Sequence, residues 1–257
     1  MSETILELTN VTKTFHLGTE DVQIIKGVSF KISKGDFVIL FGPSGCGKST
    51  VLNIALGLEE PTSGDIFFLD KNLYEYSDDQ RAQIRKKEVG MVYQQSNWIK
   101  SLNVIDNICF PLTLRGVPLQ ERQKKAWEML ETVDMQKSAY QVPTELSSGQ
   151  QQRISLARAL ITKPALIVAD EPTGNLDSIA SDGVMELFQS FNKEGDTVVM
   201  VTHDLEYLKY ATRSINMADG VVIGEYRVGD DKIKKLSVSK RGSVGPVIKR
   251  VETKHNL

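Results

Sequence analysis

The chain has 257 residues, of which 40% are hydrophobic and 25% charged, and its formal net charge is -2. This length can bury one large core, and the balanced charge excludes an overall attraction to nucleic acid or anionic lipid. The N-terminus lacks a basic segment followed by an apolar one, and no apolar run approaches the roughly 18 to 20 residues of a membrane helix. We therefore expect a soluble, unsecreted protein in which Cys46 and Cys109 are reduced thiols.

Turn residues separate apolar, β-rich runs, and several runs precede helix-like segments, which predicts an α/β domain. Residues 5–32 and 66–69 predict a small antiparallel sheet. The runs 37–41, 165–169 and 197–202 are continuous rather than alternating, which predicts parallel strands buried on both faces. Residues 96–161 are rich in helix formers and predict an inserted helical subdomain, and Asp219-Gly220 within 215–223 predicts a hairpin. We expect one domain over residues 1–229 and a basic tail over 230–257.

The segment GPSGCGKST after the first buried run matches the phosphate-loop pattern. It comprises Gly42, Pro43, Ser44, Gly45, Cys46, Gly47, Lys48, Ser49 and Thr50. Its glycines let backbone N–H groups point at phosphate oxygens, and a helix that begins near Lys48 adds its positive end. Lys48 would neutralise the β and γ phosphates, and Ser49 would bind Mg²⁺. A glycine-rich turn without a ligand is the alternative, which the preceding strand and the following apolar helix disfavour.

The segment ALIVADEPTGNLD, residues 165–177, places two adjacent carboxylates at the end of an apolar strand. Such a pair is costly to bury without a cation or hydrogen bonds. Asp170 would hold Mg²⁺, and Glu171 would polarise the attacking water. Taken alone, the pair fits a solvated turn equally well, but the phosphate loop favours a hydrolytic site.

The segment LSSGQ, residues 146–150, runs into a helix and predicts a second anion-binding surface, which a single nucleotide does not require. Taken alone, it fits an ordinary capped helix equally well. Two half-sites in one chain suggest that two copies pair head to tail.

Over about residues 3–227, this ordered set of motifs resembles the ATP-binding subunit of ABC transporters. The resemblance implies a P-loop NTPase core with a RecA-like parallel sheet, an N-terminal antiparallel β-subdomain, an inserted helical subdomain, and ATP and Mg²⁺ as ligands. It also implies catalysis by Glu171, His203, Gln94 and Lys48, with Ser49, Gln94 and Asp170 at the metal. The remaining nucleotide contacts implied are Phe15, which stacks on adenine, the signature residues Ser147, Ser148, Gly149 and Gln150, and Asp177 of the D-loop.

Two positions depart from the family pattern. Ser148 stands where the family usually has glycine, so a Cβ would weaken closure if the position needs a positive φ or a close backbone approach. Phe15 stands where tyrosine is commoner, which keeps the stacking face and loses a hydroxyl. Phe15 as a packed aromatic and His203 as a structural histidine are the alternatives at those positions.

The segments DEPTGNLD and QIRKKEVGMVYQ resemble the branch that contains MacB-type exporters, lipoprotein-releasing ATPases and FtsE. This implies a homodimer on the cytoplasmic face of the membrane, bound to separate membrane subunits and serving export, extraction or mechanotransmission. We expect a partner helix to dock near residues 98–103, with Trp98 as ordinary core the alternative. Three other functions compete: an importer-type ABC ATPase, a soluble ABC ATPase without a membrane partner, and a regulator that does not hydrolyse ATP. No contact with nucleic acid is expected.

Overall fold

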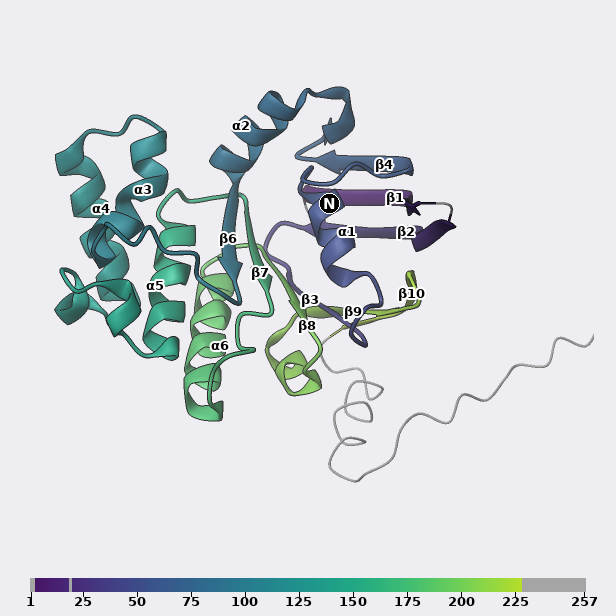
Figure 1. Cartoon of the computed structure of the whole chain (residues 1–257). Helices are drawn as coiled ribbons and strands as arrows, with labels where there is room; N and C mark the ends of the chain where they lie inside the picture. The colour runs from purple at the N-terminus through teal and green to yellow at the C-terminus, as the bar shows by residue number, and fades with distance from the viewer. Residues whose placement is uncertain (1–2, 19, 228–257) are drawn as a thin grey trace, which may run out of the picture.

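A computed structural model describes residues 3–18 and 20–227 (Figure 1), so the predicted basic tail lies outside the described residues. The described chain contains two sheets. The first has the strand order β2-β1-β4-β5, and the second has the order β10-β9-β3-β8-β7-β6. Both the antiparallel sheet and the parallel sheet were predicted from the sequence.

The four-stranded sheet is antiparallel throughout. Its strands are β1 (Thr4–Leu17), β2 (Glu20–Ser33), β4 (Ser63–Phe68) and β5 (Lys71–Asn72). Leu8, Ile25 and Ile66 are at most 2% exposed and share one hydrophobic cluster with helix α1 (Lys48–Ala55). The small sheet therefore covers the helix that follows the phosphate loop.

The six-stranded sheet is parallel from β9 to β6, and β10 runs antiparallel at its edge. Its strands are β3 (Phe37–Phe41), β6 (Val89–Tyr93), β7 (Leu166–Asp170), β8 (Val198–Thr202), β9 (Arg213–Ala218) and β10 (Val221–Arg227). Every residue of β3 and β8 is buried, as the continuous apolar runs predict. Asp219 and Gly220 have φ of 48 and 80 and form the predicted hairpin turn.

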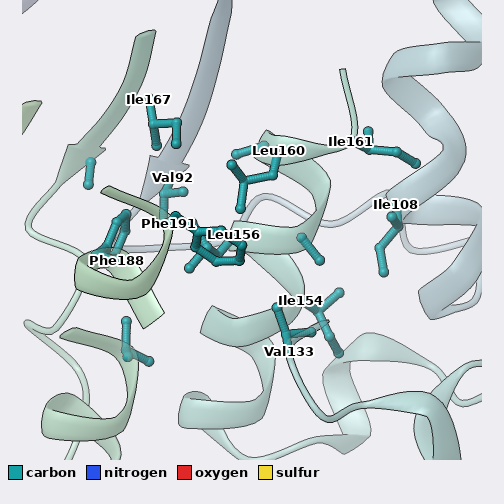
Figure 2. Close-up of a cluster of buried hydrophobic side chains, with 14 of the residues drawn as sticks. Val92, Ile108, Val133, Ile154, Leu156, Leu160, Ile161, Ile167, Phe188 and Phe191 are labelled. Atoms are coloured by element: carbon teal, nitrogen blue, oxygen red, sulfur yellow. The ribbon is translucent and has the colours of Figure 1, made fainter. Parts of the chain in front are cut away.

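Four helices share a second hydrophobic cluster with the other face of this sheet (Figure 2). They are α3 (Val104–Leu114), α4 (Leu119–Thr132), α5 (Ser148–Leu160) and α6 (Ser178–Lys193). Phe188 of α6 is fully buried and packs on Phe37 of β3, with ring centroids 6.3 Å apart. In Figure 1, α3, α4 and α5 lie together on the side of the molecule away from the four-stranded sheet. The cluster is continuous from β3 to α4, so these helices are packed onto the same core as the parallel sheet.

Helix α2 (Asp78–Glu88) and the strand β6 that follows it were not anticipated. A capping box between Ser77 and Gln80 starts α2, and charges suited to the helix dipole lie at both ends. Short 3-10 helices complete the described elements: η1 (Leu73–Glu75), η2 (Gln136–Ser138), η3 (Pro143–Glu145) and η4 (Leu205–Tyr210). Within residues 3–18 and 20–227, no helix is both long enough and apolar enough to cross a membrane.

Candidate active site

The phosphate loop lies between the end of β3 and the start of α1 and is curled around the side chain of Lys48. The Lys48 Nζ donates hydrogen bonds to the carbonyl oxygens of Gly42 and Pro43, both at 2.9 Å, and the residue is 6% exposed. Gly47, at φ 100, precedes α1 without a side-chain cap, which leaves first-turn N–H groups for an anion. A Cβ on Gly47 would lie 2.6 Å from Cδ1 of Ile25, so the loop requires glycine there.

A pocket of about 430 Å³ opens over this loop. It is lined by Phe15, Ile24, Ser44, Gly45, Gly47, Lys48, Ser49, Thr50 and Glu171. Strands β1 and β2 supply its apolar end, and the loop with α1 supplies its cationic end. A nucleotide would fit this pocket with its aromatic base at the apolar end and its phosphates at the cationic end. Cys46, within the loop, is a buried free thiol, and Cys109 of α3 is likewise buried and free.

A second hollow of about 340 Å³ adjoins the first, because Ser49 and Glu171 line both. Tyr93, Gln94, Gln95, Asn97 and Asp170 complete its lining. The hollow forms there because Tyr93 and Asp170 are register partners in neighbouring parallel strands, so both segments emerge at one edge of the sheet.

Gln94 packs against the chain that follows Glu171. Its Nε2 donates to Oδ1 of Asn175 at 3.4 Å, and a Cβ on Gly174 would lie 2.5 Å from that nitrogen. A side chain at position 174 would displace the Gln94 amide from this contact. The Gly-Asn pair in PTGNLD is the local sequence signal for this contact.

Asp170 has the properties expected of a cation ligand. Burial, and then the charge of Glu171, raise the pKa of Asp170 above its ordinary value, while Ser49 and Lys48 partly oppose this. Its Oδ1 is buried without a hydrogen-bond partner among the described residues. An ionised carboxylate with an orphaned oxygen is costly unless a cation meets it.

The neighbouring donors fit Mg²⁺ in particular. The hydroxyl of Ser49 and the amide of Gln94 line the same hollow as Asp170, and Mg²⁺ prefers oxygen ligands. The described residues hold no cluster of three His, Cys, Asp or Glu side chains suited to a metal. Proteins usually bind Mg²⁺ through a few oxygen ligands, and phosphates and water complete its coordination shell.

Glu171 and His203 follow the adjacent parallel strands β7 and β8, and their side chains meet. The Nδ1 of His203 lies 2.9 Å from Oε1 and 2.8 Å from Oε2 of Glu171. Because an ionised carboxylate only accepts, Nδ1–H is the donor, and Nε2 can donate as well only if the ring carries a second proton. Glu171 has φ 48, an uncommon value for a residue with a side chain, and its N–H donates to the carbonyl of Val201 at 2.9 Å. The backbone thus holds the carboxylate over the pocket.

The signature residues form the start of α5 and line neither hollow. Ser147 is the N-cap: its Oγ accepts from the N–H of Gln150 at 3.3 Å, and Oε1 of Gln150 accepts from the N–H of Ser147 at 3.0 Å. Ser148 is the first helical residue, is exposed and lacks a positive φ, so the chain itself is not strained by its Cβ. A Cβ on Gly149, in contrast, would lie 2.8 Å from that of Ala180 in α6.

Asp177 also lies outside both hollows. Its Oδ1 accepts from the N–H of Ala180 at 2.8 Å, so within this chain Asp177 serves as the N-cap of α6. Asp177 and the signature therefore form one surface at the paired starts of α5 and α6. This surface contributes to neither hollow beside the phosphate loop of the same chain.

Trp98 is bound to α5 rather than free for a partner. Its Nε1 donates to Oε1 of Gln151 at 2.8 Å, and the Arg158 guanidinium lies 4.6 Å from the ring centroid. A groove of about 500 Å³ lies nearby, with a mainly apolar lining. It is formed by Lys86, Val89, Gly90, Met91, Tyr93, Asn97, Ile99, Phe110, Pro111, Leu114, Arg158, Ala159 and Thr162. Only Ile99 comes from the segment 98–103 in which we expected the groove.

The sequence did not indicate several residues that the fold adds to the two hollows. Ile24 completes the apolar end of the larger one, and Tyr93, Gln95 and Asn97 join Gln94 in the smaller. The neighbours of Gln94 were recoverable from their position after a buried strand. Ile24 carries no local signal, because its role depends on the pairing of β1 with β2.

Comparison with known proteins agrees with this site. A family model described as "ABC transporter" matches residues 25–174. An uncharacterized ABC transporter ATP-binding protein of Thermotoga maritima is 40% identical over 88% of this chain and 96% of its own length. The macrolide export ATP-binding/permease protein MacB of Syntrophobacter fumaroxidans is 41% identical over 88% of this chain, which spans only 32% of that longer protein.

Among solved structures, a dimeric post-hydrolysis state of the ATP-binding cassette MJ0796 bound to ADP and Pi gives a TM-score of 0.80. It is 38% identical to this chain, and the match covers 87% of this chain and 99% of that one. MJ0796 comes from Methanocaldococcus jannaschii. The phosphate loop, the Glu171–His203 pair and these likenesses lead to one conclusion: the chain belongs to the ABC transporter family and is one of its ATP-binding cassettes, which are ATPases.

Proposed function

We propose that two copies of this chain close head to tail on two ATP molecules and transmit the motion to a separate membrane subunit. The observation that carries this proposal is the separation of the signature from the phosphate loop. Ser147 and Gly149 start α5 at a surface that lines neither hollow of their own chain. A second copy would bring its signature to the open phosphate loop. The dimeric form of MJ0796 supports this arrangement.

Each residue of the site would have a distinct role. Phe15 would stack on the adenine, and Lys48 with the N–H groups of the loop would hold the phosphates. Ser49, Gln94 and Asp170 would hold Mg²⁺, which when bound supplies positive charge next to the phosphate oxygens. Glu171 would orient the attacking water and accept its proton. His203, through Nδ1, would keep the Glu171 carboxylate in place.

The membrane partner would occupy the groove beside β6. Leu114 in this groove is 53% exposed, and Met91 and Tyr93 lie on the strand that leads into Gln94. A partner segment seated there would therefore sense and transmit movement at the nucleotide. MacB supports such a partner, because it is an ATP-binding/permease protein and this chain matches only about a third of its length. The same likeness favours export or extraction and a position at the cytoplasmic face of the membrane.

Co-purification tests the membrane partner. The tagged chain, isolated from its source cells in mild detergent, should bring down an integral membrane protein, and Leu114→Glu should abolish this. Leu119→Glu is the matched control, because Leu119 is 52% exposed on α4 but does not line the groove. Failure to recover any membrane protein with the unmodified chain would contradict the transporter function.

Complementation between two inactive variants tests the shared site. Lys48→Met removes the phosphate-loop charge, and Ser147→Asp keeps an N-cap residue but places a negative charge where the γ-phosphate would lie. Each alone should be inactive. Their mixture would form heterodimers with one intact composite site and should recover about a quarter of the wild-type rate. No recovery, with both variants folded and able to pair, would mean that each chain forms its site alone.

A further inference from the structure

The ring of Phe15 is contacted by a cation that stays outside the nucleotide pocket. The Nζ of Lys13 lies 4.9 Å from the centroid of this ring. Phe15 lines the pocket, whereas Lys13 does not. Both residues belong to β1 and are two positions apart, and the pairing of β1 with β2 shifts register between Lys13 and Thr14. Lys13 therefore reaches the pocket only through the ring.

Lys13 is itself held by two acceptors on the turn before β4. Its Nζ lies 2.5 Å from Oε1 of Glu59 and donates to the carbonyl oxygen of Glu60 at 2.6 Å. The Lys13 side chain is only 13% exposed. A long side chain that is both ion-paired and largely buried has lost most of its rotamer freedom. The Lys13 ammonium is therefore held in one position next to the ring.

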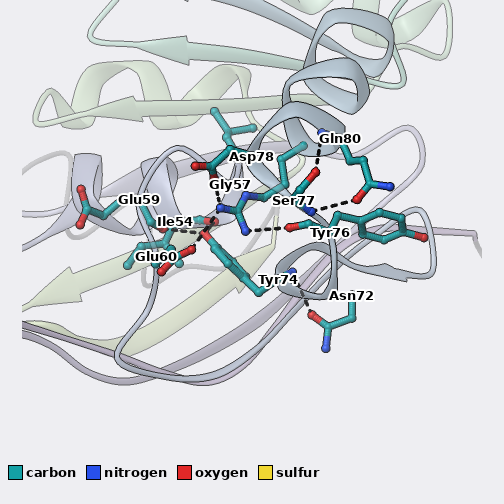
Figure 3. A network of polar contacts seen from close by, with 12 residues as sticks. Ile54, Gly57, Glu59, Glu60, Asn72, Tyr74, Tyr76, Ser77, Asp78 and Gln80 are labelled. Carbon is teal, nitrogen blue, oxygen red and sulfur yellow. Dashed lines mark hydrogen bonds and ion pairs between the residues drawn. The ribbon is translucent and has the colours of Figure 1, made fainter.

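A polar network holds the Glu59–Glu60 turn in place (Figure 3). The Tyr74 hydroxyl lies 2.5 Å from the carbonyl oxygen of Glu59 and 2.7 Å from that of Ile54. Arg81, which is 5% exposed, pairs with Glu60 at 3.1 Å and with Asp78. The turn is thereby attached to the end of α1 and to the start of α2. Its position, and that of Lys13, is therefore set by contacts within the chain.

We infer that Lys13 is a positioning residue for the nucleotide base: held by Glu59 and Glu60, it fixes one face of the Phe15 ring so that the other face is ready to stack on a purine. This inference rests on the proposed function of Phe15. A cation attracts the ring through its negative face and so selects one ring orientation. A base that stacks on a ring already in place loses less freedom on binding. Phenylalanine has no hydroxyl with which to anchor itself, so the contact with Lys13 supplies the anchor.

The test separates an effect on the base from an effect on the phosphates. Lys13→Met keeps much of the side-chain volume and removes the charge. KM for ATP should rise about three- to fivefold, with kcat changed less than about twofold. Inorganic tripolyphosphate, which carries phosphates but no base, should inhibit the variant and the wild type with the same constant. Lys13→Arg should restore the wild-type KM, because a guanidinium can pair with Glu59 and lie over the ring.

A control and a background variant complete the experiment. On the same sheet, the Nζ of Lys31 lies 2.8 Å from Oε1 of Glu7. Lys31→Met removes this ion pair and should leave KM for ATP unchanged. In a Phe15→Ala background, which itself should weaken ATP binding, Lys13→Met should add nothing, because its effect passes through the ring.

Two outcomes would overturn the inference. An unchanged KM in Lys13→Met would show that the ring needs no anchor, and equal weakening of ATP and tripolyphosphate would show that Lys13 acts as a general positive charge. If Phe15→Ala weakens ATP binding while Lys13→Met does not, the inference fails and the proposed base site survives. If Phe15→Ala has no effect either, the proposed base site fails as well.

Discussion

The Nδ1 of His203 lies 2.9 Å from Oε1 of Glu171, so the two groups expected to act on the attacking water already contact each other in a single chain. The residues are 32 positions apart, and their contact depends on the parallel pairing of β7 with β8. Glu171 is turned toward the pocket by a backbone with φ 48, and the side chain of His203 is 59% exposed. The Glu171–His203 contact therefore forms within one chain, and in our proposal a second copy supplies the signature.

The substitution Glu171→Gln should retain ATP binding and lose at least about 100-fold in turnover, because the amide keeps the shape of the side chain but cannot accept a proton. In MgATP the variant should elute as a stable dimer. Phosphate release and size-exclusion chromatography measure the two effects. Glu186→Gln, at an exposed position of α6, is the control and should behave as the wild type. Unchanged turnover in Glu171→Gln would remove Glu171 from the catalytic role.

The substitution Asp170→Asn should stabilise the nucleotide-free protein while weakening its response to Mg²⁺. Burial raises the pKa of Asp170 above its ordinary value, so its ionised form costs stability at neutral pH, and the neutral amide should raise the unfolding free energy. As the pH falls below the folded-state pKa, wild-type Asp170 becomes neutral too, and the difference in unfolding free energy should shrink toward zero.

Thermal unfolding of both proteins from about pH 7.5 to about pH 4.5 measures this difference. The control is Asp182→Asn, because Tyr210 and then Lys209 lower the pKa of Asp182. That variant should gain no stability at neutral pH. A wild-type protein more stable than Asp170→Asn at neutral pH would mean that Asp170 already has a compensating partner without a cation.

Small substitutions at two adjacent signature positions should change the unfolding free energy by different amounts. Gly149→Ala should cost about 1 to 3 kcal/mol of unfolding free energy, because its Cβ would lie 2.8 Å from that of Ala180. Ser148→Gly should change the same quantity by less than about 1 kcal/mol, because Ser148 is exposed at the first turn of α5. Urea denaturation measures both.

The same Ser148→Gly variant tests closure. If Ser148 hinders the approach of a second copy, the variant should reach half-maximal ATPase activity at a lower protein concentration. An unchanged concentration dependence would show that the proposed interface accepts the serine.

The substitution Tyr74→Phe should cost about 1 to 2 kcal/mol of unfolding free energy, because it leaves the carbonyl group of Glu59 without the Tyr74 hydroxyl, whereas that of Ile54 keeps the N–H of Gly57. Burial of the Tyr74 hydroxyl raises its pKa, so the donor form is kept at all ordinary pH values. Denaturant unfolding measures the loss. Tyr140→Phe is the control. Tyr140 is 73% exposed, so removal of its hydroxyl should leave the unfolding free energy unchanged. An equal effect of both variants would mean that the network in Figure 3 does not hold the turn.

The sequence alone determined the local parts of this protein. Gly42, Gly47 and Lys48 predict a phosphate loop because backbone conformation and charge are properties of a short segment. Continuous apolar runs such as Phe37–Phe41 predict buried strands because burial on both faces leaves no polar alternation. The resemblance to the family then ordered these parts, including residues such as Gln94 and His203 that carry little signal of their own.

Only the tertiary structure decided which parts meet. Strand pairing brings Ile24 beside Phe15, and Glu171 beside His203, over separations that no local pattern encodes. The fold also leaves Ser147 outside the pocket over the phosphate loop of its own chain and places Lys13 beside the ring of Phe15. The physical reason is that such contacts follow from the register of strands and the packing of helices, which depend on the whole core at once.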